Sequence, residues 1–158
     1  MPRALFVILL VGTLVRAAGL GWGIPNGWVV APIHPDEATN LQPVQHMLAE
    51  GTWNPGFFSY GTLYSYLVLG LVGPLQALGF SLTEGSSILL ARLVTLVLGV
   101  GMIPLMYLLA ERLFDRRTGR IAAWLMALAP GPALHSAFAT VDIPASFFAL
   151  GSLYATVC

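Results

Sequence analysis

The stretch from Leu89 to Leu109 constrains this chain most, because it is long and apolar enough to cross a membrane. A helix needs about 20 apolar residues to cross the roughly 30 Å of hydrocarbon in a bilayer. Arg92 is the only charged residue in the stretch. Gly99 and Gly101 favour close contact with a neighbouring helix, and Pro104 favours a kink. The stretch therefore predicts a transmembrane helix.

The composition extends this prediction to the whole chain. Hydrophobic residues make up 57% of the sequence, charged residues make up 9%, and the mean hydropathy is +0.81. Soluble domains are roughly a quarter charged, so an ordinary water-soluble fold is excluded. Seven arginines balance seven acidic residues, and nothing in this balance indicates nucleic-acid binding. Cys158 is the single cysteine, so neither an intramolecular disulfide nor a Cys-based zinc site is expected, and the redox compartment stays open.

Three further apolar segments complete an expected set of about four transmembrane helices. The first is Ala4–Gly23; a signal peptide cleaved near Arg16–Gly19 is the less favoured alternative, because several spans follow. The third span is 121–134, shortened by two prolines near its end. Residues 143–158 begin a fourth span that has no polar flank to end it, so we expect an incomplete membrane domain.

The arginines indicate which ends of the spans face the cytoplasm. Arg3 precedes the first span, and a second group follows Leu109: Arg112, Arg116, Arg117 and Arg120. Basic residues concentrate on the cytoplasmic side, and 25–88 contains none. Tyr60–Phe80 is apolar enough to be another span, but crossing would separate Arg3 from the second arginine group. We therefore expect Tyr60–Phe80 to lie in the interface, within an external loop over 25–87 that contains interfacial helices.

Two neighbouring carboxylates begin the helix expected in this external loop. Asp36 and Glu37 follow Pro35 and precede a helix-like stretch that ends at Gly51. One interpretation makes Asp36 a helix cap and Glu37 a solvated acid of the first turn. The other makes Asp36 a general base that deprotonates an acceptor hydroxyl, which then attacks the anomeric carbon of a lipid-linked sugar. The residues alone leave both interpretations open.

A second acidic position follows the third span, on the same expected side of the membrane. Asp142 is either the cap of the last helix, helped by Pro144, or a partner that orients an acceptor, a metal or Asp36. His34 and His135 lie near the two acids in the expected topology. Their spacing matches no metal-ligand pattern, so a divalent metal is not favoured and no cofactor is expected.

Two arginines lie inside predicted spans. Arg92 lies near the outer end of the second span, where its planar donor fork suits a lipid phosphate; the alternative is that its side chain snorkels to the headgroups. Arg16 lies deeper in the first span, and we expect it to face protein or a lipid headgroup, without a catalytic role.

Taken in order, these segments resemble the dolichyl-phosphate-mannose protein mannosyltransferase-like branch of the GT-C glycosyltransferases, which includes the aminoarabinose transferases of lipid A. The segments similar to the first external loop of that family are His34–Glu37, Met47–Gly51 and Asn54–Tyr60. Those similar to its second span and cytoplasmic turn are Leu90–Leu93, Leu109–Phe114 and Asp115–Gly119. Those similar to its third span and second external loop are Ala129–Pro130, His135–Ser136 and Thr140–Pro144.

The resemblance implies an all-α, polytopic transmembrane helical bundle, with residues 1–158 as the N-terminal part of one GT-C-like membrane domain. It implies a membrane glycosyltransferase that uses a polyprenyl-phosphate sugar donor, inverts the anomeric centre and acts on a protein, glycan or lipid acceptor. Asp36, Glu37 and Asp142 are the candidate catalytic residues. The candidate substrate-binding residues are His34, Arg92, His135 and Tyr60. The expected location is a bacterial or archaeal plasma membrane with the active site outside.

The chain also departs from this family. Family members are several times longer, so we expect this chain to lack much of the donor and acceptor sites and to be inactive alone. No lysine follows Gly61 where aminoarabinose transferases place one against the lipid phosphate, which disfavours that sugar. The alternatives are an inactive truncated fragment and a transporter or channel subunit. Transporters, however, usually place ionisable groups near the membrane midplane.

Overall fold

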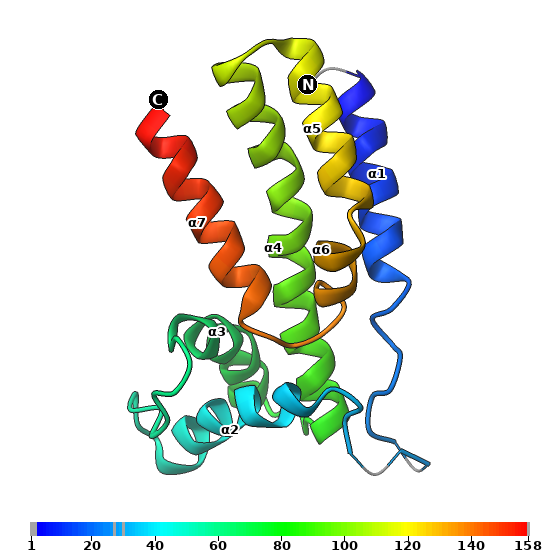
Figure 1. Ribbon diagram of the computed structural model, residues 1–158. Coiled ribbons are helices and arrows are strands. Elements are labelled where there is room, and N and C mark those ends of the chain that lie inside the picture. The colour runs from blue at the N-terminus through cyan, green and yellow to red at the C-terminus, as the bar shows by residue number, and fades with distance from the viewer. Residues whose placement is uncertain (1–2, 27, 30, 158) are drawn as a thin grey trace. The chain divides into compact units, whose positions relative to one another are not determined.

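The computed structural model describes residues 3–26, 28–29 and 31–157. Over these residues the chain forms seven α-helices and no strand, which confirms the all-α class (Figure 1). It divides into two compact units. Unit 1 comprises residues 1–19, 95–137 and 142–158, and unit 2 comprises residues 20–94 and 138–141. Each unit is described by itself.

The helix α4, Glu84–Leu113, has the length and composition of a membrane span. It has 30 residues, and its mean hydropathy reaches 2.3 over an 18-residue window. Of the helices in the described residues, α4 alone meets both conditions. It contains the predicted span Leu89–Leu109 and extends beyond both of its ends. Its first residues, up to Val94, belong to unit 2 and the remainder to unit 1.

Unit 1 is built from helices that pack through small and aliphatic side chains. Besides the larger part of α4 it contains the helices α1 Arg3–Ala17, α5 Arg116–Leu128, α6 Pro130–His135 and α7 Asp142–Val157. Figure 1 shows α1 and α5 side by side. Buried residues of α1, α4 and α5 form one core: Leu5, Ile8, Ile103, Tyr107, Ala123 and Ala127. A second core joins α4 to α7 through Met102, Ile143 and Leu150.

The glycines of α4 make the close contacts that their positions predicted. A methyl group built on Gly99 would overlap the Ser136 side chain. One built on Gly101 would lie 2.8 Å from the Phe147 ring. Both glycines therefore let neighbouring segments of unit 1 approach the backbone of α4.

In two of the predicted spans the helix ends earlier than expected. The first was expected over Ala4–Gly23, but α1 ends at Ala17. The third was expected over 121–134, but α5 ends at Leu128 and a short α6 begins at Pro130. The intervening Ala129 has φ −58° and ψ 122°, the extended conformation that a following proline favours.

Unit 2 contains the helices α2, Pro35–Glu50, and α3, Leu63–Ala77, together with the start of α4. Gly51 ends α2 in the left-handed conformation at φ 60°, as its position predicted. Side chains from α2, α3 and α4 form the core: Leu41, Val44, Tyr64, Val68, Val72, Ile88 and Ala91, joined by Ala139. With 15 residues, α3 is about 22 Å long, shorter than the hydrocarbon layer. Its location in the interface stays a prediction.

Candidate active site

Glu37 and Arg92 form a buried ion pair within unit 2. Glu37 lies in the first turn of α2, Arg92 lies on α4, and both side chains have 0% exposure. Nε of Arg92 donates to Oε1 of Glu37, and Nη2 donates to Oε2, each over 2.7 Å. This is the two-pronged geometry in which a guanidinium binds a carboxylate most strongly. The interpretation of Glu37 as a solvated acid is therefore wrong.

The remaining guanidinium nitrogen of Arg92 binds the chain that precedes α2. Nη1 donates to the carbonyl oxygens of Leu20 and Trp22, each over 2.7 Å. The Phe138 ring lies beside the guanidinium, with its centroid 5.4 Å from Cζ. All three nitrogens of Arg92 thus bind protein, so snorkelling to headgroups is also wrong. The two carbonyls that accept hydrogen bonds from Arg92 belong to the segment that follows α1.

Two side chains in the first turns of α2 also form hydrogen bonds with the backbone of Ala139, which belongs to unit 2. The N–H of Ala139 donates to Oε1 of Glu37 over 2.8 Å. Nδ2 of Asn40 donates to the Ala139 carbonyl over 3.0 Å. Because Glu37 and Asn40 are three residues apart, they share one face of α2. This face satisfies both backbone groups of one residue that lies about a hundred positions later in the chain.

His34, and not Asp36, caps α2. Nδ1 of His34 accepts a hydrogen bond from the Asp36 N–H over 3.3 Å, and Pro35 is the first helical residue. The interpretation in which Asp36 caps the helix is therefore wrong. The His34 ring also packs against Phe138, with centroids 4.8 Å apart.

This arrangement leaves the Asp36 carboxylate available. Asp36 is half-buried in the first turn, and its carboxylate has no hydrogen bond among the described residues. Two acids that are adjacent in sequence thus have opposite surroundings, because Glu37 is buried and paired.

Unit 1 brings His135 and Asp142 together. His135 is the last residue of α6 and Asp142 the first of α7. Nδ1 of His135 lies 3.6 Å from Oδ2 of Asp142, beyond hydrogen-bond distance, and finds no partner among the described residues. The side chains are 44% and 60% exposed. They line a cavity of about 220 Å³ together with Ser146 and four less polar residues, Met102, Gly131, Pro132 and Ile143.

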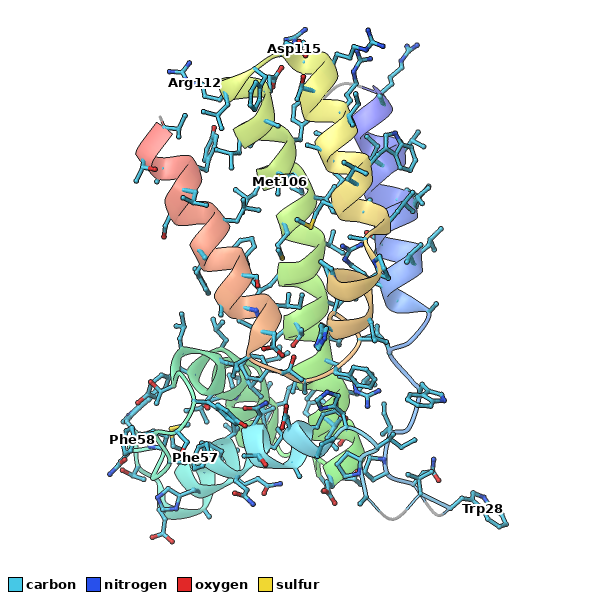
Figure 2. All side chains as sticks on the ribbon, viewed as in Figure 1. Trp28, Phe57, Phe58, Met106, Arg112 and Asp115 are labelled. Carbon is cyan, nitrogen blue, oxygen red and sulfur yellow. The ribbon has the colours of Figure 1, made fainter. Side chains whose placement is uncertain are left out.

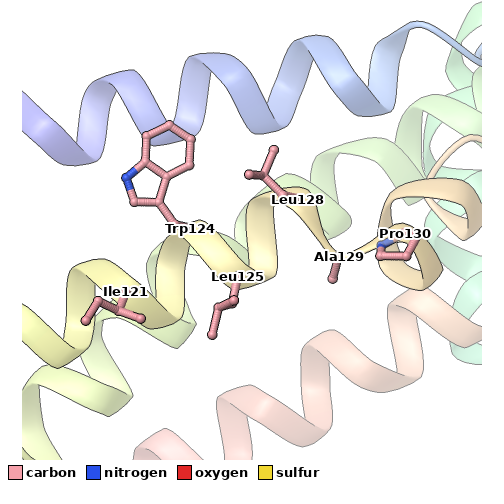
Figure 3. Close-up of a pocket in the computed structure, with 6 residues that line it drawn as sticks. All are labelled: Ile121, Trp124, Leu125, Leu128, Ala129 and Pro130. Atoms are coloured by element: carbon pink, nitrogen blue, oxygen red, sulfur yellow. The ribbon is translucent and has the colours of Figure 1, made fainter.

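A second cavity of unit 1 is apolar. Its volume is about 500 Å³, and its lining comes from α5 and the start of α6: Ile121, Trp124, Leu125, Leu128, Ala129 and Pro130 (Figure 3). None of these side chains can donate or accept a proton at neutral pH. The cavity offers apolar contact but no catalytic group.

Tyr60 and the aromatic loop after α2 do not join the acidic residues. The Tyr60 ring is 40% exposed and packs edge-on against Phe57, with centroids 5.8 Å apart. Figure 2 labels Phe57 and Phe58 in this loop. Over the described residues no group of three or more His, Cys, Asp or Glu side chains gathers in a metal-binding arrangement.

The turn between α4 and α5 carries the arginine-rich segment, whose location in the cytoplasm stays a prediction (Figure 2). Asp115 caps α5: its Oδ1 accepts from the Thr118 N–H over 2.7 Å. This hydrogen bond lowers the pKa of the Asp115 carboxyl below its ordinary value of 3.8. Arg116 donates to Glu111 over 2.9 Å on the surface.

Sequence reasoning missed Asn40 and Phe138. Asn40 gave one signal, a polar side chain three residues after Glu37 on a helix with apolar neighbours. Phe138 gave none, because its contacts with His34 and Arg92 depend on the folded chain.

Comparison with known proteins supports one family. A family described as dolichyl-phosphate-mannose-protein mannosyltransferase matches residues 71–158, more than half of the 158-residue chain. The match includes Arg92, His135 and Asp142, and it begins at residue 71, after Asp36 and Glu37. Searches of curated proteins and of solved structures gave no match. On this match, the chain belongs to the dolichyl-phosphate-mannose-protein mannosyltransferase family, whose members are membrane-embedded glycosyltransferases.

Proposed function

We propose that this chain belongs to an inverting membrane glycosyltransferase and carries its catalytic base. It moves a sugar from a polyprenyl-phosphate donor to an acceptor hydroxyl on the extracytoplasmic side. The observation that carries the proposal is the contrast between Asp36 and Glu37. Both oxygens of Glu37 bind Arg92, while the neighbouring Asp36 carboxylate is partly exposed and has no hydrogen bond among the described residues.

In the proposed reaction Asp36 is the general base. The acceptor oxygen attacks the anomeric carbon, the bond from that carbon to the phosphate oxygen breaks, and the polyprenyl phosphate leaves with the electron pair. The acceptor proton passes to the Asp36 carboxylate. A single displacement of this kind inverts the anomeric centre. Glu37 and Arg92 act here as the structural support of Asp36, because their polar atoms already bind protein.

In unit 1, taken by itself, we assign His135 and Asp142 to a hydroxyl of the acceptor other than the one that gives its proton to Asp36. A hydroxyl between Nδ1 of His135 and Oδ2 of Asp142 can donate to the carboxylate and accept from the imidazole when that nitrogen carries the proton. The 3.6 Å separation leaves both atoms without a mutual hydrogen bond. Met102 and Ile143 supply apolar contact on the same cavity wall.

The sidedness rests on charge. Residues 25–88 contain no basic residue, whereas the turn between α4 and α5 is rich in arginine. Basic turns favour the cytoplasm, so the loop with Asp36 belongs on the opposite side.

Substituting Asp36 tests the proposal. Asp36→Asn in the full-length enzyme, reconstituted with a polyprenyl-phosphate sugar, is expected to lower kcat by about 10²–10⁴-fold. The unfolding temperature should stay near that of the unaltered enzyme, because the carboxylate has no structural partner. The matched control is Glu50→Gln, an exposed acid at the other end of α2, which should leave kcat unchanged. Full turnover in Asp36→Asn would rule out Asp36 as the base.

A further inference from the structure

The break between α5 and α6 removes hydrogen-bond donors from the end of α5. In an α-helix each carbonyl accepts from the N–H four residues later. The carbonyl of Met126 would accept from residue 130, but Pro130 has no N–H. The helix ends at Leu128, so the Ala127 carbonyl also lies among the last four carbonyls that a helix leaves without a donor.

Arg16 supplies these carbonyls with donors. Its Nη2 donates to the Met126 carbonyl and its Nη1 to the Ala127 carbonyl, each over 2.7 Å. Nη1 also donates to the Gly12 carbonyl over 3.1 Å. Arg16 is 0% exposed, although it lies in the last turn of α1. No acidic partner faces it among the described residues. Its charge is instead balanced by the negative end of the α5 dipole.

A close approach of α1 and α5 makes these contacts reachable. A methyl group built on Gly12 would lie 3.2 Å from Cβ of Ala127. Ala123 and Ala127 have no exposed surface and face the same contact. Small residues one helical turn apart let two helices approach closely. Arg16 follows Gly12 by one turn, so it meets α5 where that helix ends.

We propose that Arg16 is a positioning residue that replaces the N–H groups lost at Pro130. By satisfying two carbonyls in an apolar unit, it allows α5 to stop at Leu128 and α6 to begin in a new direction. The helix α6 has six residues and ends at His135, beside Asp142. Arg16 therefore fixes the cavity to which the proposed function assigns the acceptor. Only this last step depends on the proposed function.

A double-mutant cycle in the full chain, purified in detergent, tests the replacement. Arg16→Met should lower the unfolding temperature by roughly 6–10 °C, because it removes hydrogen bonds from a charged donor to buried carbonyls. In a Pro130→Ala background the chain regains the missing N–H, so the same change should lower the temperature by less than half as much.

Pro132→Ala is the matched background, because residue 132 would serve the Leu128 carbonyl and not the carbonyls that Arg16 reaches. There Arg16→Met should have its full effect. Arg112→Met, an exposed arginine of the same unit, should change little. Equal effects of Arg16→Met in all backgrounds would overturn the proposal. If Arg16→Met alone does not fold, recovery of folding in the double variant with Pro130→Ala, but not in that with Pro132→Ala, supports it.

Acceptor kinetics test the positioning role. In the full-length enzyme Arg16→Lys keeps one donor group but not the fork, so KM for the acceptor should rise several-fold while KM for the donor holds. An unchanged acceptor KM, in a variant whose stability has fallen as expected, would overturn the positioning role and leave the Asp36 assignment untouched. If the unaltered enzyme transfers no sugar, the proposed function is contradicted. The double-mutant cycle of unfolding temperatures would still test the role of Arg16 at the end of α5.

Discussion

Unit 1 and unit 2 each bury one arginine completely, and they balance its charge in different ways. In unit 2 Arg92 faces the Glu37 carboxylate and two backbone carbonyls. In unit 1 Arg16 faces backbone carbonyls alone. In unit 2 a carboxylate from another helix supplies the countercharge. Dipoles suffice where the arginine lies at the C-terminal end of a helix. The same residue type thus serves a tertiary ion pair in one unit and a helix terminus in the other.

The largest effects are expected from breaking the pair in unit 2. Glu37→Gln leaves Arg92 without a countercharge, and Arg92→Met leaves the Glu37 carboxyl buried without its charged partner. Each should lower the free energy of unfolding by about 3–5 kcal/mol. The double variant Glu37→Leu with Arg92→Met should recover much of this loss, because apolar pairs of similar volume often replace buried ion pairs. Chemical denaturation in detergent measures all three.

The surface pair of Glu111 and Arg116 is the control for this experiment. Arg116 is 84% exposed, so Glu111→Gln should change stability by about 0.5 kcal/mol or less. If Glu37→Gln costs no more than Glu111→Gln, the ion pair does not hold unit 2 together.

The next effect concerns the approach of α1 to α5 in unit 1. Gly12→Ala places a methyl group against Ile103 and Ala127, and it moves Arg16 away from its carbonyls. We expect a loss of about 2–3 kcal/mol. Gly151→Ala, on the open side of α7, should instead stabilise by about 0.5–1 kcal/mol, because glycine is a poor helix former. Thermal unfolding of the two variants should therefore shift in opposite directions.

A smaller effect is expected from removing one of the two hydrogen bonds between α2 and the backbone of Ala139. Asn40→Leu removes the donor to the buried Ala139 carbonyl but leaves the pair of Glu37 and Arg92 intact. The free energy of unfolding should fall by about 1–2 kcal/mol. Hydrogen exchange of the Ala139 amide should remain protected, because Glu37 still accepts from it. Loss of protection would show that Asn40, and not Glu37, holds this segment.

The smallest effect contrasts the exposed start of α5 with its buried end. The pKa of Asp115 is lowered by its hydrogen bond from Thr118, so its ionised form stabilises the folded state. That contribution is complete above the ordinary pKa of 3.8 and disappears as the pH falls through the lowered value. Asp115→Asn should remove this part of the acid dependence. Unfolding temperatures of both proteins below pH 4 measure it, and parallel profiles would contradict the assignment.

Local sequence patterns predicted the helices of this chain. The apolar length of Leu89–Leu109 lies inside α4, and Gly51 ends α2 because glycine adopts the left-handed conformation without strain. The ends of α1 and α5 were predicted less well. After α1, Arg92 binds two backbone carbonyls that would otherwise lie in the predicted span. At the end of α5, Pro130 favours an extended backbone conformation for Ala129, so the helix stops there.

Most contacts of the candidate site could not be predicted from the sequence. Glu37 and Arg92 were both singled out, but 55 residues separate them and no local pattern pairs them. One of the two interpretations of Asp36 made it the cap of α2, but the His34 imidazole takes that place. His135 and Asp142 were expected on one side of the membrane, and their proximity follows from the short segment between α6 and α7.

The contacts of Glu37 determine how much of the chain must be synthesised before unit 2 can fold. Glu37 leaves the ribosome 55 residues before Arg92 and 102 residues before the amide of Ala139. Until both partners have been made, its carboxylate cannot be buried without a large cost and must stay hydrated. Unit 2 thus cannot close as it emerges. The last contact of Glu37 is made only when the segment that carries Ala139 has been synthesised and returns to α2.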